Sequence, residues 1–326
     1  MILKQFNNQR PITVGFLVLI ALSLWSFSFY NPGADASTVA SSIYPWFVNL
    51  IEGIPFIQSI AAIVLIIVQA IMINNIINES QLISTKTYIP SLVYIVLMSS
   101  TPEMLNFHPG LIGNFFLILM LSRLFKTYRD ESSFAKIFDA GLYLGLASTL
   151  HFPYILMVAF GWAALSILRS FAWRDWVIFT LGTTIPYCFI LTYYYAFDNL
   201  TNVSDHFILF AENRVFEDIE IPYYYFPVLI LFVGLILLGA KTVFLEWRIG
   251  AIKVKKLLST LIIFSLFSFL VPLLLSELSI MLYTGLAIPL CVYLSNYFIN
   301  NRKPIVAEVS FFLLLGSIVY LHVVTL

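Results

Sequence analysis

Residues 169–198 have the sequence RSFAWRDWVIFTLGTTIPYCFILTYYYAFD. The stretch opens with arginines and tryptophans, continues with an apolar run, and closes with a tyrosine triplet and an aspartate. An apolar run of about 20 residues lets an α-helix cross about 30 Å of hydrocarbon. Tryptophan and tyrosine favour the membrane interfaces, and arginine favours the cytoplasmic side. The stretch therefore predicts a membrane-spanning helix that starts in the cytoplasm.

The rest of the chain repeats this pattern. Its 326 residues are 60% hydrophobic and only 10% charged, whereas a soluble globular protein carries about 25% charged residues. The apolar segments do not alternate as the strands of a membrane barrel would. They fall at 11–30, 57–73, 88–100, 104–121, 134–150, 153–168, 175–197, 223–240, 257–275, 279–297 and 306–325. We predict an all-α, polytopic integral membrane protein with about 11 transmembrane helices, and one transmembrane domain over residues 1–326.

Two neighbouring segments differ from the others. Segment 88–100 is short, and Pro109 and Gly110 interrupt segment 104–121. This pair favours a hairpin of half-length helices that does not fully cross the bilayer. The expected number of spans is therefore about nine to twelve, and the later loops keep their sides in either case.

Positive charge is sorted between alternate gaps. Every Lys and Arg except Arg214 falls in one set of gaps, which begins with Lys4 and Arg10. The positive-inside rule places this set in the cytoplasm. The N-terminus is then inside, the C-terminus is outside, and Pro11–Tyr30 is a retained signal anchor.

The opposite set of gaps holds all four histidines and ten carboxylates. In the first outer loop, apolar residues recur at helical spacing between residues 39 and 50, which predicts an interfacial helix on the outer leaflet. Tyrosine triplets at 193–195 and 223–225 place the ends of the loop 198–222 at the same interface. A second interfacial helix is predicted near Phe207 and Phe210.

Ionisable groups at membrane-edge depth on the outer side are the candidate functional residues. A carboxylate there is partly desolvated, which raises its pKa and suits it to act as a general base. Asp35 is the strongest candidate base, although its position after Pro32 and Gly33 also suits a turn residue or a helix cap. The alternative for the whole set is a series of solvated loop caps. The candidate catalytic residues are Asp35 and Glu52, and the candidate substrate-binding residues are Glu103, His108, His151 and Arg214.

Arg214 stands alone among acidic residues, so it forms either a surface ion pair or a phosphate contact, because a guanidinium matches phosphate oxygens. The four histidines are far apart, and there is no Cys-x-x-Cys pair and no phosphate-binding glycine loop. We therefore predict no metal, no cofactor and no ATP-driven transport by this chain alone. Cys188 and Cys291 lie in apolar runs and act as small hydrophobic residues. The formal net charge of zero gives no electrostatic footprint for nucleic acid.

This layout resembles that of the C-type glycosyltransferases (GT-C). Those enzymes have a cytoplasmic N-terminus, one span, a long outer loop with an early acid and interfacial helices, and then short hairpin helices. Here the resemblance covers residues 1–200, and residues 201–326 add further helices. It implies transfer of a sugar from a polyprenyl-phosphate donor at the outer face, with Asp35 as general base and Arg214 or His151 on the donor phosphate. The chain departs from the pattern in having no second acid close after Asp35, one outer arginine and no large soluble domain.

The sequence also resembles a family of uncharacterised inner-membrane proteins common in Bacteroidota, notably over Ile89–Ser100 and Phe138–Pro153. This resemblance implies a multi-pass protein of a Gram-negative inner membrane, whose outer face is periplasmic.

Two classes of function follow. The leading hypothesis is a GT-C-like transferase whose partners are membrane lipids and a polyprenyl-phosphate-linked sugar. The alternative is a non-catalytic subunit of a cell-envelope, secretion or motility complex, in which Gly141, Gly145 and Ala147 support helix packing within or between chains. Transport is disfavoured because charge in the middle of the membrane is nearly absent.

Overall fold

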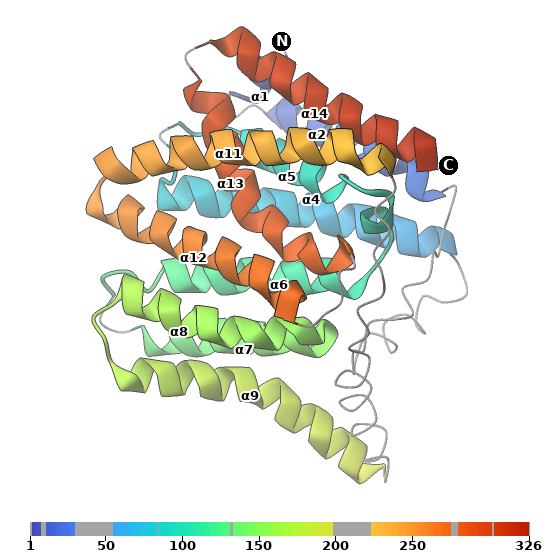
Figure 1. The fold of residues 1–326 in the computed structure, drawn as a ribbon. Coiled ribbons are helices and arrows are strands. Elements are labelled where there is room, and N and C mark those ends of the chain that lie inside the picture. The colour runs from blue at the N-terminus through green and yellow to red at the C-terminus, as the bar shows by residue number, and fades with distance from the viewer. Residues whose placement is uncertain are drawn as a thin grey trace.

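Helices run back and forth between two ends of the molecule (Figure 1). The computed structural model describes residues 2–7, 11–29, 55–83, 85–130, 133–197, 223–274, 280–301 and 303–325, and these contain no strand. The main helices are α2 (Pro11–Trp25), α4 (Pro55–Ser80), α5 (Ile89–Met98), α6 (Pro109–Phe125), α7 (Phe134–Leu150), α8 (Met157–Leu168), α9 (Trp173–Ala196), α11 (Phe226–Ile249), α12 (Ile252–Leu274), α13 (Ala287–Asn300) and α14 (Pro304–Thr325). Short helical turns flank them: α1 (Ile2–Phe6), η1 (Ser26–Phe29), η2 (Pro102–Leu105), η3 (Phe152–Leu156), η4 (Tyr223–Tyr225) and η5 (Ile280–Leu286).

Each predicted apolar segment overlaps one of the main helices, so the all-α prediction is confirmed for the described residues. Six of the helical stretches found there are long and apolar enough to cross a membrane. They are Ile12–Phe29, Ile57–Ser80, Trp173–Ala196, Tyr223–Ile249, Ile252–Leu273 and Pro304–Thr325. The total of 11 full spans stays a prediction. The ten residues of α5 rise only about 15 Å, half the hydrocarbon thickness, whereas the 17 residues of α6 rise about 25 Å. The hairpin of two half-length helices stays a prediction.

Large apolar side chains point outward on the peripheral helices. Phe189 on α9 is 73% exposed, Ile230 on α11 is 69% exposed and Leu313 on α14 is 55% exposed. A row of such side chains has no favourable place in water, whereas lipid tails cover it without cost. The chain is therefore a multi-pass membrane protein that contacts membrane lipids through these helices.

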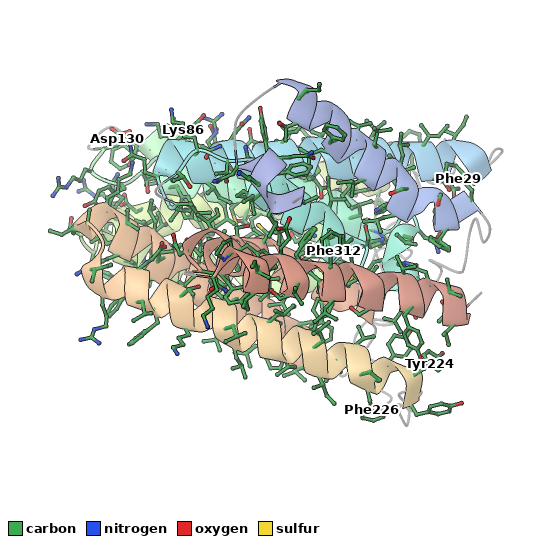
Figure 2. The ribbon with its side chains drawn as sticks, turned by 90° about the horizontal axis from the view of Figure 1, so that it is seen from above. Phe29, Lys86, Asp130, Tyr224, Phe226 and Phe312 are labelled. Atoms are coloured by element: carbon green, nitrogen blue, oxygen red, sulfur yellow. The ribbon has the colours of Figure 1, made fainter. Side chains whose placement is uncertain are left out.

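The two ends of the molecule differ in charge. Lys86 and Asp130 lie at one end, and Phe29, Tyr224 and Phe226 lie at the other (Figure 2). We call the first the basic end; its connections are 81–88, 126–133, 169–172, 250–251 and 301–303. We call the other the histidine end; it includes the connections 99–108 and 151–156. The alternation of charged loops inferred from the sequence thus corresponds to two spatial ends, and their assignment to cytoplasm and periplasm stays a prediction.

The core is built around α5, because all ten residues from Ile89 to Met98 are buried. Helices α4 and α13 pack along it, and α2 covers part of it. Prolines in the first turns of α5 and α6 fit there, since those turns have no intrahelical partner for an N–H group. A short helix in the interior can carry polar side chains that lipid never contacts.

Helices α7 and α9 approach closely through glycines. A Cβ atom on Gly141 would lie 2.1 Å from the carbonyl oxygen of Phe179, and one on Gly145 would lie 2.5 Å from that of Thr183. The contact is reciprocal, because a Cβ on Gly182 would lie 2.4 Å from the carbonyl oxygen of Phe138. These glycines therefore serve packing within the chain, which is the first of the two roles that the sequence left open.

Candidate functional site

A buried amide organises the histidine end. Asn114 of α6 accepts a hydrogen bond from the hydroxyl of Tyr154 at 2.8 Å and donates one to the carbonyl oxygen of Thr284 at 2.9 Å. The Tyr154 and Thr284 hydroxyl oxygens lie 3.3 Å apart, so Thr284 supplies the hydrogen for that contact. One amide side chain thus joins α6, η3 and η5, three elements that are far apart in the sequence.

A second set of polar side chains extends this network toward α4 and α5. Tyr94 donates to Oε1 of Gln69 at 2.7 Å, and the Gln69 amide donates to the carbonyl oxygen of Leu111 at 2.8 Å. Ser91 donates to the carbonyl oxygen of Ala70 at 2.9 Å. All of these donors are buried. Polar groups in a membrane protein interior are stable only when they are paired in this way.

Two buried histidines border the Asn114 network. His108 precedes α6 and His151 follows α7, and they are 0% and 1% exposed. The ring of His151 meets the ring of Tyr154 edge to face, with centroids 4.6 Å apart. The Nδ1 atom of His108 lies 2.8 Å from the carbonyl oxygen of Asn106. For these two histidines the solvated loop cap is the wrong alternative.

Burial keeps both rings neutral at physiological pH. It lowers the pKa of His108 to about 4 and the pKa of His151 to about 3, and the nearby His108 lowers the pKa of His151 further. A neutral imidazole offers one hydrogen-bond donor and one acceptor. The pair therefore suits the hydroxyl groups of a neutral ligand better than a bare anion.

Glu103 occupies the outer edge of the same end. It lies on η2, where its Oε1 accepts a hydrogen bond from the hydroxyl of Tyr225 at 3.1 Å. Helix α14 packs against η2 and carries the buried His322. The ring of His322 stacks on Phe27 of η1 at a centroid distance of 5.1 Å. Carboxylate, phenol and imidazole groups from three elements, η2, η4 and α14, thus lie at one edge of the molecule.

Several buried polar atoms at this end have no hydrogen-bond partner among the described residues. They are Oε2 of Glu103, Nε2 of His108, both ring nitrogens of His151, and Nε2 of His322. An unsatisfied buried polar atom costs about 1–3 kcal/mol, so native proteins seldom keep several of them together. A bound ligand with hydroxyl or amide groups would offer hydrogen-bond partners to these atoms.

The structure accounts for some of the sequence candidates. Glu103 and His108 lie in the connection from α5 to α6, and His151 lies in the next connection at the same end. Asp35, Glu52 and Arg214 lie outside the described residues, as do the predicted interfacial helices. The roles given to all six residues stay predictions.

Sequence reasoning did not single out Asn114, Tyr154 or Thr284. The available signal was weak: Asn114 is a lone amide inside the apolar segment NFFLILML that runs from residue 114 to 121. No group of three His, Cys, Asp or Glu side chains that would hold a metal ion occurs among the described residues.

The chain was compared with protein-family models, curated proteins and solved structures, and it matches none of them.

Proposed function

We propose that this protein is a membrane-embedded transferase that moves a sugar from a polyprenyl-phosphate donor to an acceptor at the periplasmic face of a bacterial inner membrane. Its fold would be GT-C-like over residues 1–200. The observation that supports the proposal best is the group of unpartnered buried polar atoms on Glu103, His108, His151 and His322. Sugars carry many hydroxyl groups, each of which both donates and accepts hydrogen bonds, and such groups would satisfy these atoms.

In the proposed transfer, carboxylates and imidazoles have different roles. Sugar transfer needs a base to take the proton from the acceptor hydroxyl, and a carboxylate held at the membrane edge supplies one. Asp35 is the proposed base, and Glu103 binds substrate with its partner-free Oε2. The neutral rings of His108 and His151 would bind sugar hydroxyls, or donate one hydrogen bond to the donor phosphate. Arg214 would neutralise the charge of that phosphate.

The proposal is tested in a strain that lacks the gene. The deletion should make a lipid-linked sugar accumulate in lipid extracts analysed by mass spectrometry, because its consumer is missing. The intact gene should restore the normal level, and Asp35→Asn and Glu103→Gln should not. The matched control is Asp139→Asn at the basic end, where the Asp139 carboxylate only pairs with Arg123 at 3.5 Å. Normal consumption of the sugar lipid by a well-expressed Asp35→Asn variant would refute the proposed catalysis.

The alternative, a non-catalytic subunit of an envelope complex, predicts a different result. The glycines that favoured it in the sequence pack against α9 inside the chain. Extraction in a mild detergent followed by native mass measurement separates the two hypotheses. A stable complex with other membrane proteins, together with an unchanged lipid-linked sugar pool in the deletion strain, would favour the subunit.

A further inference from the structure

A polar cavity lies at the basic end, opposite the candidate site. Its volume is about 320 Å³, and it opens between the end of α4, the end of α6 and the start of α12. Three ammonium groups line it, those of Lys126, Lys136 and Lys253, against one carboxylate, that of Glu79. The cavity wall is therefore positively charged.

The described residues neutralise this positive charge only in part. Lys126 lies 3.3 Å from Glu79, and Lys136 lies 2.5 Å from Asp130. Lys253 forms no ion pair with any of the described residues, and its helix offers no acid in the first turn. An anion in the cavity would meet an unpaired ammonium group together with two that are already held in place.

Two further cations lie close to the ring of Tyr128, which lines the cavity. The guanidinium carbon of Arg129 lies 5.5 Å from the centre of the Tyr128 ring, and the ammonium of Lys256 lies 5.6 Å from it. Both distances are within the range of cation–π attraction. Cations from two helix ends thus converge on the same rim.

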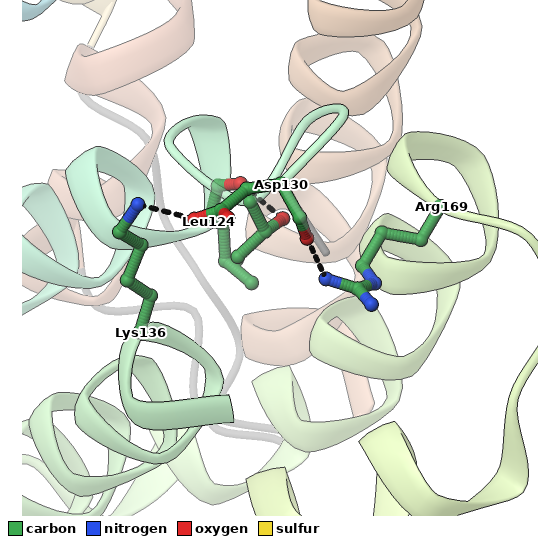
Figure 3. Close-up of polar contacts among 5 residues, drawn as sticks. Leu124, Asp130, Lys136 and Arg169 are labelled. Atoms are coloured by element: carbon green, nitrogen blue, oxygen red, sulfur yellow. Dashed lines mark hydrogen bonds and ion pairs between the residues drawn. The ribbon is translucent and has the colours of Figure 1, made fainter. Parts of the chain in front are cut away.

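The loop that forms this rim is fixed by contacts to neighbouring helices. Figure 3 shows Asp130 between Lys136 and Arg169. The Arg169 guanidinium donates to the Asp130 carbonyl oxygen at 2.7 Å and pairs with the Asp175 carboxylate at 2.9 Å. The turn contains Arg129 with φ of 57°, a left-handed conformation that is uncommon for residues other than glycine. These contacts orient the cations before a ligand binds, which reduces the entropy lost on binding.

The inner wall of the cavity is apolar. Ile76 and Phe125 line it, and they also line a narrow apolar void of about 20 Å³ between α4, α6, α12 and α13. The lysines would contact the anionic group of a ligand, and the apolar wall would contact its hydrocarbon part. That combination distinguishes an amphiphile from a soluble anion.

We propose that this cavity binds the phosphate group of an anionic membrane lipid of the adjacent leaflet, with Lys126, Lys136 and Lys253 contacting the phosphate and the apolar wall contacting the start of the lipid chains. Lysine binds phosphate as a point charge, and the cavity lies at one end of helices that include α4 and α12, which are long and apolar enough to cross a membrane. The proposal is independent of the transferase hypothesis, because it concerns the other end of the molecule.

The test uses the purified full chain in detergent, with lipid binding counted by native mass spectrometry. The probes are dioleoyl phosphatidylglycerol, dioleoyl phosphatidylcholine and inorganic phosphate at matched ionic strength. Lys253→Gln should weaken phosphatidylglycerol binding by about fivefold or more, since it removes a charge-assisted contact. Lys253→Arg should keep most of the affinity. The matched control is Lys255→Gln, because Lys255 is on the same helix and outside the cavity lining; it should change affinity less than about twofold.

The outcomes separate lipid from soluble phosphate. If the protein prefers phosphatidylglycerol and inorganic phosphate does not displace it, the cavity is a lipid site. If inorganic phosphate displaces the lipid, the lysines contact phosphate but the ligand is a soluble one. Equal losses in Lys253→Gln and Lys255→Gln would overturn the proposal, as would the absence of any preference among the probes. Gel filtration of each variant excludes misfolding as the cause of a loss.

Discussion

Tyr154 donates its hydroxyl hydrogen to the side-chain oxygen of Asn114 at 2.8 Å, across 40 residues of sequence. The bond joins η3 to α6, and Asn114 passes the connection on to Thr284 of η5. It therefore holds together the elements that carry His108 and His151. Gly113 makes room for it, because a Cβ atom there would lie 2.6 Å from the Tyr154 ring.

Removing this hydroxyl should destabilise the protein. Tyr154→Phe leaves the side-chain oxygen of Asn114 without its donor, and hydrogen bonds in membrane proteins contribute about 1 kcal/mol. We expect a decrease of about 1 kcal/mol in the free energy of unfolding, measured by denaturation in detergent micelles. The control is Tyr320→Phe, because Tyr320 is 46% exposed on α14. Equal stability of the two variants would show that the network does not hold this end together.

A side chain at the glycines where α7 and α9 touch should destabilise the protein. Gly141→Ala places a methyl group 2.1 Å from the Phe179 carbonyl oxygen, so the helices must separate. Overpacking of this kind costs about 1–3 kcal/mol. Gly316→Ala on α14 is the matched control, because nothing lies within 4 Å of its new methyl group. Thermal unfolding in detergent should show a loss for the first variant only, and a loss of the same size in both would contradict the crossing geometry.

Acidification should destabilise the fold through the buried histidines. The pKa of His108 is about 4 and that of His151 about 3 in the folded protein, against about 6.5 in an unfolded chain. Below pH 6.5 the unfolded state therefore binds protons that the folded state does not, and the free energy of unfolding falls as the pH decreases. At pH 5.5 the loss is about 1 kcal/mol for each histidine.

The contribution of one ring is measured by difference. His151→Asn removes one titrating group, so its stability between pH 7.5 and 5.5 should fall about 1 kcal/mol less than that of the unchanged protein. His108 is the charged or titratable group that acts on His151 directly, and it remains in the variant. Identical pH profiles would mean that His151 takes up its proton in the folded state as well.

Charge sorting predicts which side each end faces. In a Cys188→Ala background, Asn213→Cys should react with a membrane-impermeant maleimide added from the periplasm. Ala251→Cys, in the α11–α12 turn of the basic end, should react only after the inner membrane is opened. The opposite labelling pattern would reverse the orientation, and the proposed periplasmic transfer would be wrong with it.

Much of the fold follows from local composition. Each apolar segment overlaps a helix, because a bilayer leaves a spanning chain few other ways to satisfy its backbone. The boundaries differ where polar residues continue a helix: segment 57–73 lies within Pro55–Ser80, and segment 223–240 overlaps a helix that ends at Ile249. Hydropathy alone does not show such extensions, because polar residues such as Asn74 and Lys241 lower it although the helix continues.

The site was less predictable. Glu103, His108 and His151 stood out in the sequence because charged groups are rare in this chain. Asn114 and Tyr154 did not, since a single amide or phenol hardly changes the hydropathy of an apolar run. Their importance comes from a pairing over 40 residues, and no local pattern encodes it.

The sequence alone determined that this is a membrane protein, where its helices lie along the chain, and how charge is sorted between its ends. These features depend on composition and on the order of residues along the chain. The tertiary structure decided that α5 lies in the interior, that His108 and His151 are buried beside one amide network, and that lysines from three helix ends enclose a cavity. Those features depend on which helices pack together, and that choice is made by the close fit of side chains that are distant in sequence.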